Sequence, residues 1–273
     1  MEKIDIISDK IKQELLDFLY KDEMMNVFLI HYIENQPDAL RELYIGKTDN
    51  EISEVVHLKN DGNSYFTNFY CSSNEGLRNI SKLIANIRRK GMLLAGKAEE
   101  VKQIQKDLNI VEELYLNNYY KFDMSKNMQI NNRDFYIFRR VTKDPNDIEK
   151  LKKFLVEFFE AEEQSEIESI TSNKKIDEEM KNGVYFLEIE NEIAGMARYF
   201  GQSSRYIDIT TVFIDQKFRG RGYGSLLMKL MVQEAIKNNK IPITQTSIIN
   251  EKARHIYEEI GFVKVCDYTF QYI

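Results

Sequence analysis

The sequence contains few cysteines and prolines, and this scarcity excludes several classes of protein. Its only cysteines, Cys71 and Cys266, lie far apart and form no CxxC pair. A secreted disulfide framework is therefore not expected, and reduced thiols in the cytoplasm are the default for such residues. Three prolines and 12 glycines among 273 residues leave no room for a collagen-like or proline-rich region.

Long apolar runs and a surplus of positive charge are also missing. No segment is apolar over the length that a bilayer requires, and the first twenty residues are amphipathic and charged, unlike a signal peptide. The net charge of −6 contrasts with the basic surplus of general nucleic-acid-binding proteins. We therefore expect a soluble cytoplasmic protein with neither a membrane nor a nucleic acid as its partner.

Several signatures of catalytic and binding sites are absent as well. His31, His57 and His255 do not cluster with cysteines or carboxylates at ligand spacing, so no metal is expected. The sequence contains neither a GxSxG nucleophile elbow nor a GxxxxGK[ST] phosphate loop. Any chemistry must therefore come from other motifs.

The second half of the chain alternates strand-like and helical patterns. Strands are predicted at 133–141, in a hairpin over 183–200 that turns at Glu190–Glu192, and at 206–215, 241–247 and 262–273. Helices are predicted at 146–159, near 176–181, from within 220–225 onward, and at 250–261. This order predicts an α/β fold, in the sense of an α+β mixed sheet with helices on both faces.

The first half repeats a blurred version of the same pattern. Helices are predicted at 4–20, 23–33, 75–88 and 98–107, and strands at 43–48, 51–59, 64–72, 92–95 and 113–122. We interpret the repetition as a structural duplication with domains at 1–123 and 133–273, joined by a polar linker at 124–132. The alternative is one α+β domain that precedes an unrelated domain.

The stretch KFRGRGYGSLLMKL, residues 217–230, joins a predicted strand to a long predicted helix. The first amides of a helix have no intrahelical partner, and the helix dipole places partial positive charge there. Glycines before the helix allow an anionic ligand to approach the backbone, and Arg219 and Arg221 can add charge-assisted contacts. A pyrophosphate is the ligand that such a site suits.

Other interpretations of this stretch are weaker. Its GxGxG spacing differs from the GxGxxG of dinucleotide-binding folds, and it follows several antiparallel strands rather than a first βαβ turn. The RGRG string occurs once, inside a folded pattern, so an RNA-binding tract has little support. A plain glycine turn with two solvated arginines stays open until the downstream residues are considered.

Those downstream residues make the segment resemble the GNAT (Gcn5-related N-acetyltransferase) superfamily. Its coenzyme A signature, [R/Q]-x-x-G-x-[G/A], is met by the run Arg219–Gly224, and a later motif is met by Asn250, Ala253, Tyr257 and Gly261-Phe262. The resemblance covers about residues 135–273. The whole chain is similar to two-domain bacterial GNAT proteins, in which a degenerate N-terminal GNAT-like domain precedes the active one.

The resemblance implies a fold of two tandem GNAT-like domains, of which only the second holds acetyl-CoA. The N-terminal counterpart of the glycine motif, residues 71–80, offers only Gly76, so no coenzyme A is expected there. For that domain, packing, dimerisation or shaping of the acceptor cleft are the roles left open, and a homodimer is one possible assembly.

The resemblance also implies roles for individual residues. Backbone groups of Val212 and Ile214, with Phe213 between them in the same strand, would bind the pantetheine arm. Asn250 would lie beside that arm, together with Ala253 of the same motif. The pyrophosphate would be cradled by the amides of seven consecutive residues, namely Arg219, Gly220, Arg221, Gly222, Tyr223, Gly224 and Ser225.

Tyr257 would donate a proton to the departing thiolate of coenzyme A. A phenol with a pKa near ~10 stays protonated at neutral pH and can act as an acid; the alternative is a tyrosine that only packs in the core. The catalytic base is less visible in the sequence. Asp208 is our candidate, with Glu188 and Glu190 as further ones; each is otherwise solvated or structural, and a water relay is a further possibility.

The implied function is an acyl-CoA-dependent N-acyltransferase. It would move an acetyl group from acetyl-CoA to a primary amine of a small molecule or peptide by direct attack in a ternary complex. A catalytically inactive coenzyme A-binding sensor or interaction module is the alternative. An acidic segment with aromatic neighbours either attracts a cationic amine or is a solvated helix face; it comprises Glu157, Phe158, Phe159, Glu160, Glu162, Glu163, Glu166 and Glu168.

Overall fold

The computed structural model describes residues 1–60, 64–130 and 135–273, with only the backbone at residue 38. Residues 131–134, which include the end of the predicted linker and the predicted start of the second domain, lie outside the described residues. The chain divides into two compact units. The first comprises residues 1–119, 246–249 and 265–273, and the second comprises residues 120–245 and 250–264.

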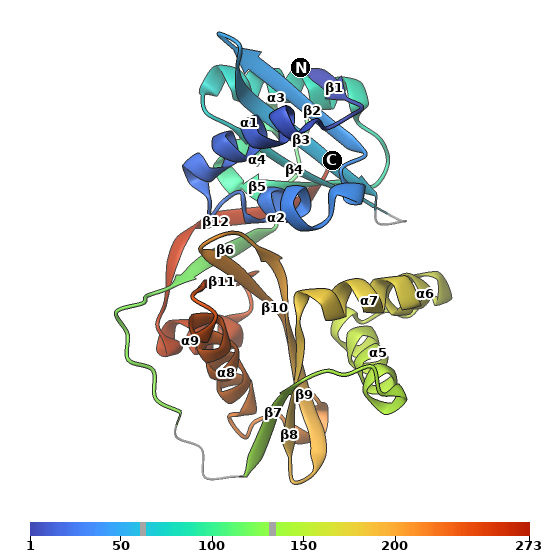
Figure 1. Ribbon diagram of the computed structural model, residues 1–273, viewed down its shortest axis with the longest axis vertical. Helices are drawn as coiled ribbons and strands as arrows, with labels where there is room; N and C mark the ends of the chain where they lie inside the picture. The colour runs from blue at the N-terminus through green and yellow to red at the C-terminus, as the bar shows by residue number, and fades with distance from the viewer. Residues whose placement is uncertain (61–63, 131–134) are drawn as a thin grey trace. The chain divides into compact units, whose positions relative to one another are not determined.

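The first unit contains a mixed sheet in the order β1-β2-β3-β4-β5-β12 (Figure 1). Its neighbours are antiparallel except β4 and β5, which are parallel. The apolar sides of α3 and α4 pack on the sheet around Ile80, Ile84, Val101 and Ile104. The elements are β1 (Glu2–Ile4), α1 (Asp9–Leu19), η1 (Tyr20–Asp22), α2 (Val27–Asn35), η2 (Pro37–Ala39), β2 (Glu42–Thr48), β3 (Glu51–Asn60), β4 (Tyr65–Cys71), α3 (Asn74–Ile87), β5 (Met92–Lys97) and α4 (Ala98–Asp107), with β12 (Phe262–Tyr272) from the end of the chain.

The second unit repeats this arrangement in the order β7-β8-β9-β10-β11-β6. Neighbours are antiparallel along β7, β8, β9 and β10, and β10 is parallel to β11. The elements are β6 (Leu116–Phe122), β7 (Tyr136–Arg140), α5 (Pro145–Phe159), α6 (Gln164–Thr171), α7 (Asn173–Asn182), β8 (Val184–Ile189), β9 (Glu192–Gln202), β10 (Tyr206–Ile214), η3 (Gln216–Phe218), α8 (Tyr223–Lys237), β11 (Ile241–Ser247) and α9 (Glu251–Ile260).

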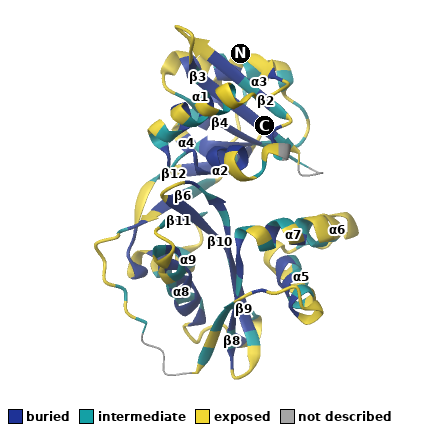
Figure 2. Ribbon diagram, in the orientation of Figure 1, coloured by how far each residue is buried: buried dark blue, intermediate teal, exposed yellow. Residues whose placement is uncertain are grey.

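Two apolar cores sandwich the sheet of the second unit (Figure 2). Alternate residues of one strand face opposite sides of a sheet. Leu187 and Ala197 accordingly pack with α8, whereas Phe186 and Met196 pack with α5 and α7. The predicted mixed sheet with helices on both faces is therefore confirmed.

The final strands of the two halves are exchanged between the sheets. β12, from the end of the chain, pairs with β5 through Tyr268–Tyr272 and Leu93–Lys97. β6, from the end of the first half, lies next to β11 in the sheet of the second unit. Because of this exchange, the compact units are not contiguous in sequence. The predicted contiguous domains, 1–123 and 133–273, stay a prediction.

One local prediction was wrong. Ile4, the first residue of the predicted helix 4–20, instead ends the short strand β1, and α1 begins only at Asp9, where the Ser8 hydroxyl accepts a hydrogen bond from the Ile11 amide. The acidic connection after α5 contains a further helix, α6, which has no buried residue (Figure 2). In the described part of the chain, no helix is both long and apolar enough for a membrane span.

Candidate active site

The parallel strands β10 and β11 separate halfway along their length. They are paired from Tyr206 and Ile241 up to Asp208 and Ile243, whereas β10 continues to Ile214. At the point of separation, the Thr244 hydroxyl donates a hydrogen bond to the Ile209 carbonyl over 2.8 Å. Beyond it, β10 is paired with β9 on its other side. The predicted pantetheine-binding residues Val212, Phe213 and Ile214 all lie in this part of β10.

The glycine turn leads from β10 into α8. Gly220 and Gly222 have φ values of 77° and 82°, which strongly favour glycine. A Cβ atom at either position would meet nothing within 4 Å, so each glycine borders open space. Gly222 is the N-cap of α8 and has no side chain with which to cap the first-turn amides. The first-turn amides of α8 therefore have no side-chain cap, and the predicted anion site at this turn stays a prediction.

The two arginines of the turn are held by local contacts. The Arg219 Nε donates a hydrogen bond to the Ile214 carbonyl over 2.8 Å, and the Arg219 amide donates to the Gln216 carbonyl over 3.2 Å. The Arg219 amide thus already donates a hydrogen bond within the turn, whereas the sequence analysis assigned it to the pyrophosphate. Arg221 lies 3.9 Å from Glu190 in an exposed ion pair, so its guanidinium is accessible to a ligand.

Tyr257, the predicted acid, lies on α9 and is 8% exposed. Its ring packs edge-on against Tyr120. Burial raises the pKa of Tyr257 to about 12, a hydrogen bond with Thr244 opposes this shift, and the charge of Asp208 adds to it.

Asp208, the predicted base, is 1% exposed at the last paired position of β10. Burial raises the pKa of its carboxyl group to about 7, and the nearby charge of Arg198 partly opposes this effect. Its Oδ1 atom has no hydrogen-bond partner among the described residues. An unpaired buried carboxylate is costly, and such groups concentrate at functional sites.

The other predicted residues have visible structural roles. The Asn250 side chain caps α9 by accepting a hydrogen bond from the Ala253 amide over 3.1 Å. Ala253 packs against the core under α8. Glu190 lies at the turn of the β8–β9 hairpin with φ 53°. None of these contacts tests the predicted roles of Asn250 and Ala253 in cofactor binding.

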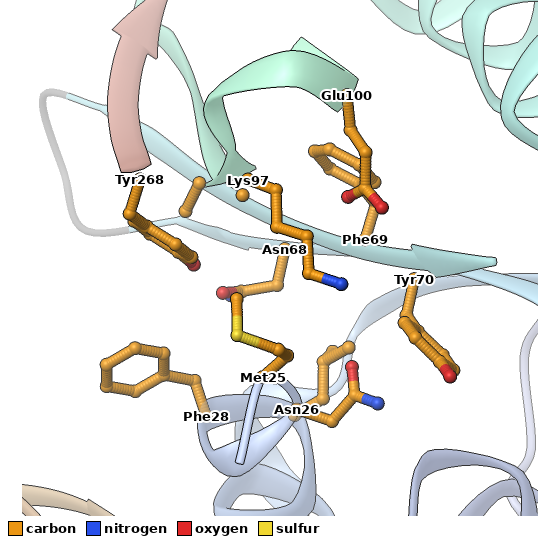
Figure 3. A pocket seen from close by; sticks show the side chains of 12 residues that line it. Met25, Asn26, Phe28, Asn68, Phe69, Tyr70, Lys97, Glu100 and Tyr268 are labelled. Atoms are coloured by element: carbon orange, nitrogen blue, oxygen red, sulfur yellow. The ribbon is translucent and has the colours of Figure 1, made fainter. Parts of the chain in front are cut away.

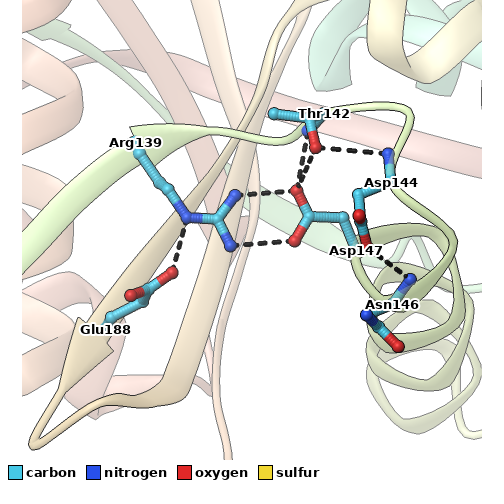
Figure 4. A network of polar contacts seen from close by, with 6 residues as sticks. All are labelled: Arg139, Thr142, Asp144, Asn146, Asp147 and Glu188. Atoms are coloured by element: carbon cyan, nitrogen blue, oxygen red, sulfur yellow. Dashed lines mark hydrogen bonds and ion pairs between the residues drawn. The ribbon is translucent and has the colours of Figure 1, made fainter.

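Glu188 belongs to a polar network that anchors α5 to the sheet (Figure 4). Arg139 binds both carboxylate oxygens of Asp147, over 2.7 and 2.8 Å, and donates from Nε to Glu188. The Thr142 amide and hydroxyl also donate to Asp147. These hydrogen bonds hold the pKa of Asp147 well below its usual range. Glu188 is thus engaged in this network through Arg139.

The acidic segment, which covers the end of α5 and the residues after it, is accessible to solvent. All six of its glutamates are exposed, and Phe158 and Phe159 form an exposed edge-to-face aromatic pair with ring centroids 5.1 Å apart. Among the described residues, no group of three histidine, cysteine or acidic side chains is arranged to hold a metal ion.

The first unit has a counterpart of this site with different side chains. Its parallel strands β4 and β5 are paired up to Asn68 and Ala95, so Asn68 corresponds to Asp208. Asn68 is 4% exposed, and its Nδ2 atom has no partner among the described residues. Figure 3 shows Asn68, Lys97 and Met25 around a cavity of about 20 Å³, which suits an ordered water.

The counterpart of the anion site in the first unit is filled by the protein itself. The Ser73 hydroxyl caps α3 by accepting a hydrogen bond from the Gly76 amide over 3.0 Å. The buried Glu54 carboxylate lies so close to Gly76 that an added Cβ would be 3.1 Å from its Oε1. A carboxylate at this position opposes a phosphate, which supports the prediction that coenzyme A does not bind there.

Comparison with known proteins agrees with this geometry. Residues 148–262 match the model of the acetyltransferase (GNAT) family. No curated protein matches the sequence.

Among solved structures, the chain is similar to a GNAT-family acetyltransferase from Colwellia psychrerythraea, with a TM-score of 0.62 and 12% identity over 100% of this chain and 99% of that one. It is also similar to a tandem GNAT protein from the clavulanic acid biosynthesis pathway, with a TM-score of 0.68 and 9% identity over 98% and 96%. A third similar structure is a GCN5-related N-acetyltransferase-like protein from Streptococcus suis, with a TM-score of 0.58 and 11% identity over 97% and 100%. At these identities the structures establish the fold alone, and the family match covers the second half. Residues 148–262 therefore match the GNAT family, and the mixed α/β fold of the whole chain is that of tandem GNAT proteins.

Proposed function

We propose that this protein is an N-acyltransferase that moves an acetyl group from acetyl-CoA to a primary amine of a small molecule or peptide. The observation that carries the proposal is the separation of β10 from β11 directly before an uncapped helix N-terminus. The separated strand offers backbone groups to the pantetheine arm, and the turn offers amides to the pyrophosphate. Gly220 and Gly222 border open space, so the turn can accept a bulky anion.

The proposed reaction needs one base and one acid. The amine nitrogen attacks the thioester carbonyl carbon, a C–N bond forms, and the C–S bond breaks. Asp208 takes the proton of the attacking nitrogen, which becomes far more acidic as the C–N bond forms. A carboxyl group with a pKa of about 7 is suited to this role near neutral pH.

Tyr257 then protonates the departing sulfur. The charge of Asp208 raises the pKa of Tyr257. Once Asp208 is protonated, this effect is lost, so Tyr257 becomes a better donor when the thiolate forms. After product release, Asp208 loses its extra proton to solvent and Tyr257 regains a proton from solvent.

The acceptor is proposed to be an amine that is cationic in solution and that loses one proton to solvent before its nitrogen attacks the thioester. The exposed glutamates after α5 would raise its local concentration, and Phe158 and Phe159 would contact its apolar part. The proposed assembly state, a homodimer, and the cytoplasmic location rest on sequence arguments alone.

The test is to incubate the purified protein with acetyl-CoA and a panel of polyamines, aminoglycosides and lysine peptides, and to follow the release of free thiol. Coenzyme A affinity is measured in parallel by calorimetry. Thiol release above the no-amine rate supports the transferase. Tight coenzyme A binding with no release across the panel would instead identify a sensor that does not catalyse transfer.

Tyr257→Phe examines the acid directly, with Tyr115→Phe as the matched control because Tyr115 is 75% exposed in the other unit. We expect Tyr257→Phe to lower turnover by roughly 10²–10⁴-fold with little change in coenzyme A affinity. If both variants turn over like the native protein, Tyr257 has no part in the mechanism.

A further inference from the structure

The part of β10 that follows Asp208 contains a bulge. Thr210 lies opposite Arg198 of β9, and Phe213 lies opposite Met196, so three residue steps on β10 match two on β9. The extra residue is accommodated at Thr211, whose φ of 50° lies in the left-handed region. A β-branched residue is strained there, so the surroundings must hold it in place.

A buried arginine supplies that constraint. The Arg198 Nε donates a hydrogen bond to the Thr211 hydroxyl over 2.7 Å, and both side chains are buried. The other end of the guanidinium pairs with Glu179 of α7, which is 2% exposed and also pairs with Lys175 over 3.2 Å. The rigid fork of the guanidinium therefore links α7, β9 and the bulge of β10.

The bulge sets the position of the strand segment that follows it. Before the bulge, Tyr206–Asp208 is fixed by pairing with β11, and after it Phe213 and Ile214 are fixed against β9. A Cβ added at Gly195 would lie 2.5 Å from the Phe213 carbonyl oxygen, so β9 and this segment are in close contact. The backbone direction at Val212 consequently depends on the conformation of Thr211.

We propose that Arg198, anchored by Glu179, is a positioning residue that holds the Thr211 bulge so that Val212–Ile214 can bind the pantetheine arm of coenzyme A. This inference rests on the coenzyme A site of the proposed function but not on turnover. Arg198 acts through Thr211 and does not contact the ligand itself. The pyrophosphate turn contacts this strand through Arg219 at the Ile214 carbonyl, and Ile214 is held by its pairing with β9, so we expect the turn to keep its geometry without the Arg198–Thr211 contact.

The test compares two ligands that differ by the pantetheine arm. Coenzyme A and adenosine 3′-phosphate 5′-diphosphate share the nucleotide and pyrophosphate, and only the former has the arm. For Thr211→Val, which keeps the branched shape but loses the acceptor, we expect the Kd of coenzyme A to rise about tenfold, as for the loss of roughly one backbone hydrogen bond. The Kd of the nucleotide should stay unchanged.

Conservative variants separate positioning from general damage. Thr211→Ser keeps the hydroxyl and should bind both ligands like the native protein. The single ammonium group of lysine cannot bind Glu179 and Thr211 at the same time as the planar guanidinium does, so Arg198→Lys should weaken coenzyme A binding as Thr211→Val does. Arg205→Lys is the control: it lies at an exposed site and should leave both Kd values unchanged. In a Thr211→Gly background, glycine adopts the bulge without strain, so Arg198→Lys should lose most of its effect.

Each outcome decides between the two ideas. If the native protein binds neither ligand, the proposed function fails and the inference fails with it. If the native protein binds coenzyme A, and Thr211→Val and Thr211→Ser bind it equally well, only the inference is overturned. Equal losses for coenzyme A and for the nucleotide would also overturn it, since they indicate a general disturbance. Thermal unfolding of each variant shows whether it is folded. If Arg198→Lys does not fold, the comparison of Thr211→Val with Thr211→Ser still tests the inference.

Discussion

Replacing Asp208 by asparagine should remove a pH-dependent loss of stability while making the proposed reaction slower. The Asp208 carboxyl group is buried, and its Oδ1 atom has no partner among the described residues. Its pKa rises from 3.8 to about 7 on folding, so the folded protein binds a proton that the unfolded chain releases between these pH values. Stability therefore falls as the pH rises from about 4 to about 7.

The size of the effect follows from the same values. A rise in pKa from 3.8 to about 7 corresponds to about 4 kcal/mol of unfolding free energy lost above pH 7. Asparagine carries no charge at any of these pH values. The free energy of unfolding of Asp208→Asn, minus that of the native protein, should consequently increase by about 3 kcal/mol between pH 4.5 and pH 8. The cost of burying the new amide group is independent of pH and cancels in this comparison.

Urea unfolding at a series of pH values measures this difference. Asp177→Asn is the control for the exchange of an aspartate for an asparagine, because Asp177 is an exposed carboxylate on α7. Parallel stability curves for the native protein and Asp208→Asn would refute the argument, since they would mean that Asp208 titrates alike in the folded and unfolded states.

Three further predictions concern the site and its support. Turnover by the native protein should rise as the pH passes about 7 and Asp208 becomes charged, and Asp208→Asn should lose this rise; a pH–rate profile measures both. Gly222→Ala should weaken coenzyme A binding about tenfold in calorimetry, because alanine costs about 1–2 kcal/mol at φ 82°, whereas no loss would show that the turn does not bind the ligand. Asp147→Asn should destabilise the protein by about 3 kcal/mol at pH 7, with exposed Glu149→Gln as control. That difference should shrink as the pH falls below about 4, because the pKa of Asp147 is lowered in the folded state; a constant difference would contradict the ion pair.

The sequence predicted those features that depend on local patterns. The hairpin turn at Glu190–Glu192 is confirmed, with Glu190 and Asn191 both at positive φ, as a two-residue turn requires. α8 begins at Tyr223, inside the predicted range, because the glycines end the preceding turn and an apolar stripe follows. Local periodicity and turn residues are sufficient for such elements.

Features that depend on distant contacts were not predictable in this way. β1 has three residues, too few to show a period, and it exists because it pairs with β2. The bulge at Thr211 contradicts the preference of threonine for regular strands and depends on Arg198, thirteen residues earlier. The sequence offered Asp208 as a candidate base, but its near-complete burial follows from packing on both sides of the sheet.

The exchange of β6 and β12 has a consequence for how the protein is made. Synthesis proceeds from the N-terminus, so β1 to β5 leave the ribosome long before residues 265–273, which pair with β5. Until then, β5 exposes the backbone groups that β12 will occupy, and such an open strand edge can pair with another chain. The first half must therefore wait for the last residues of the second, and a fragment ending at residue 123 would keep that edge open.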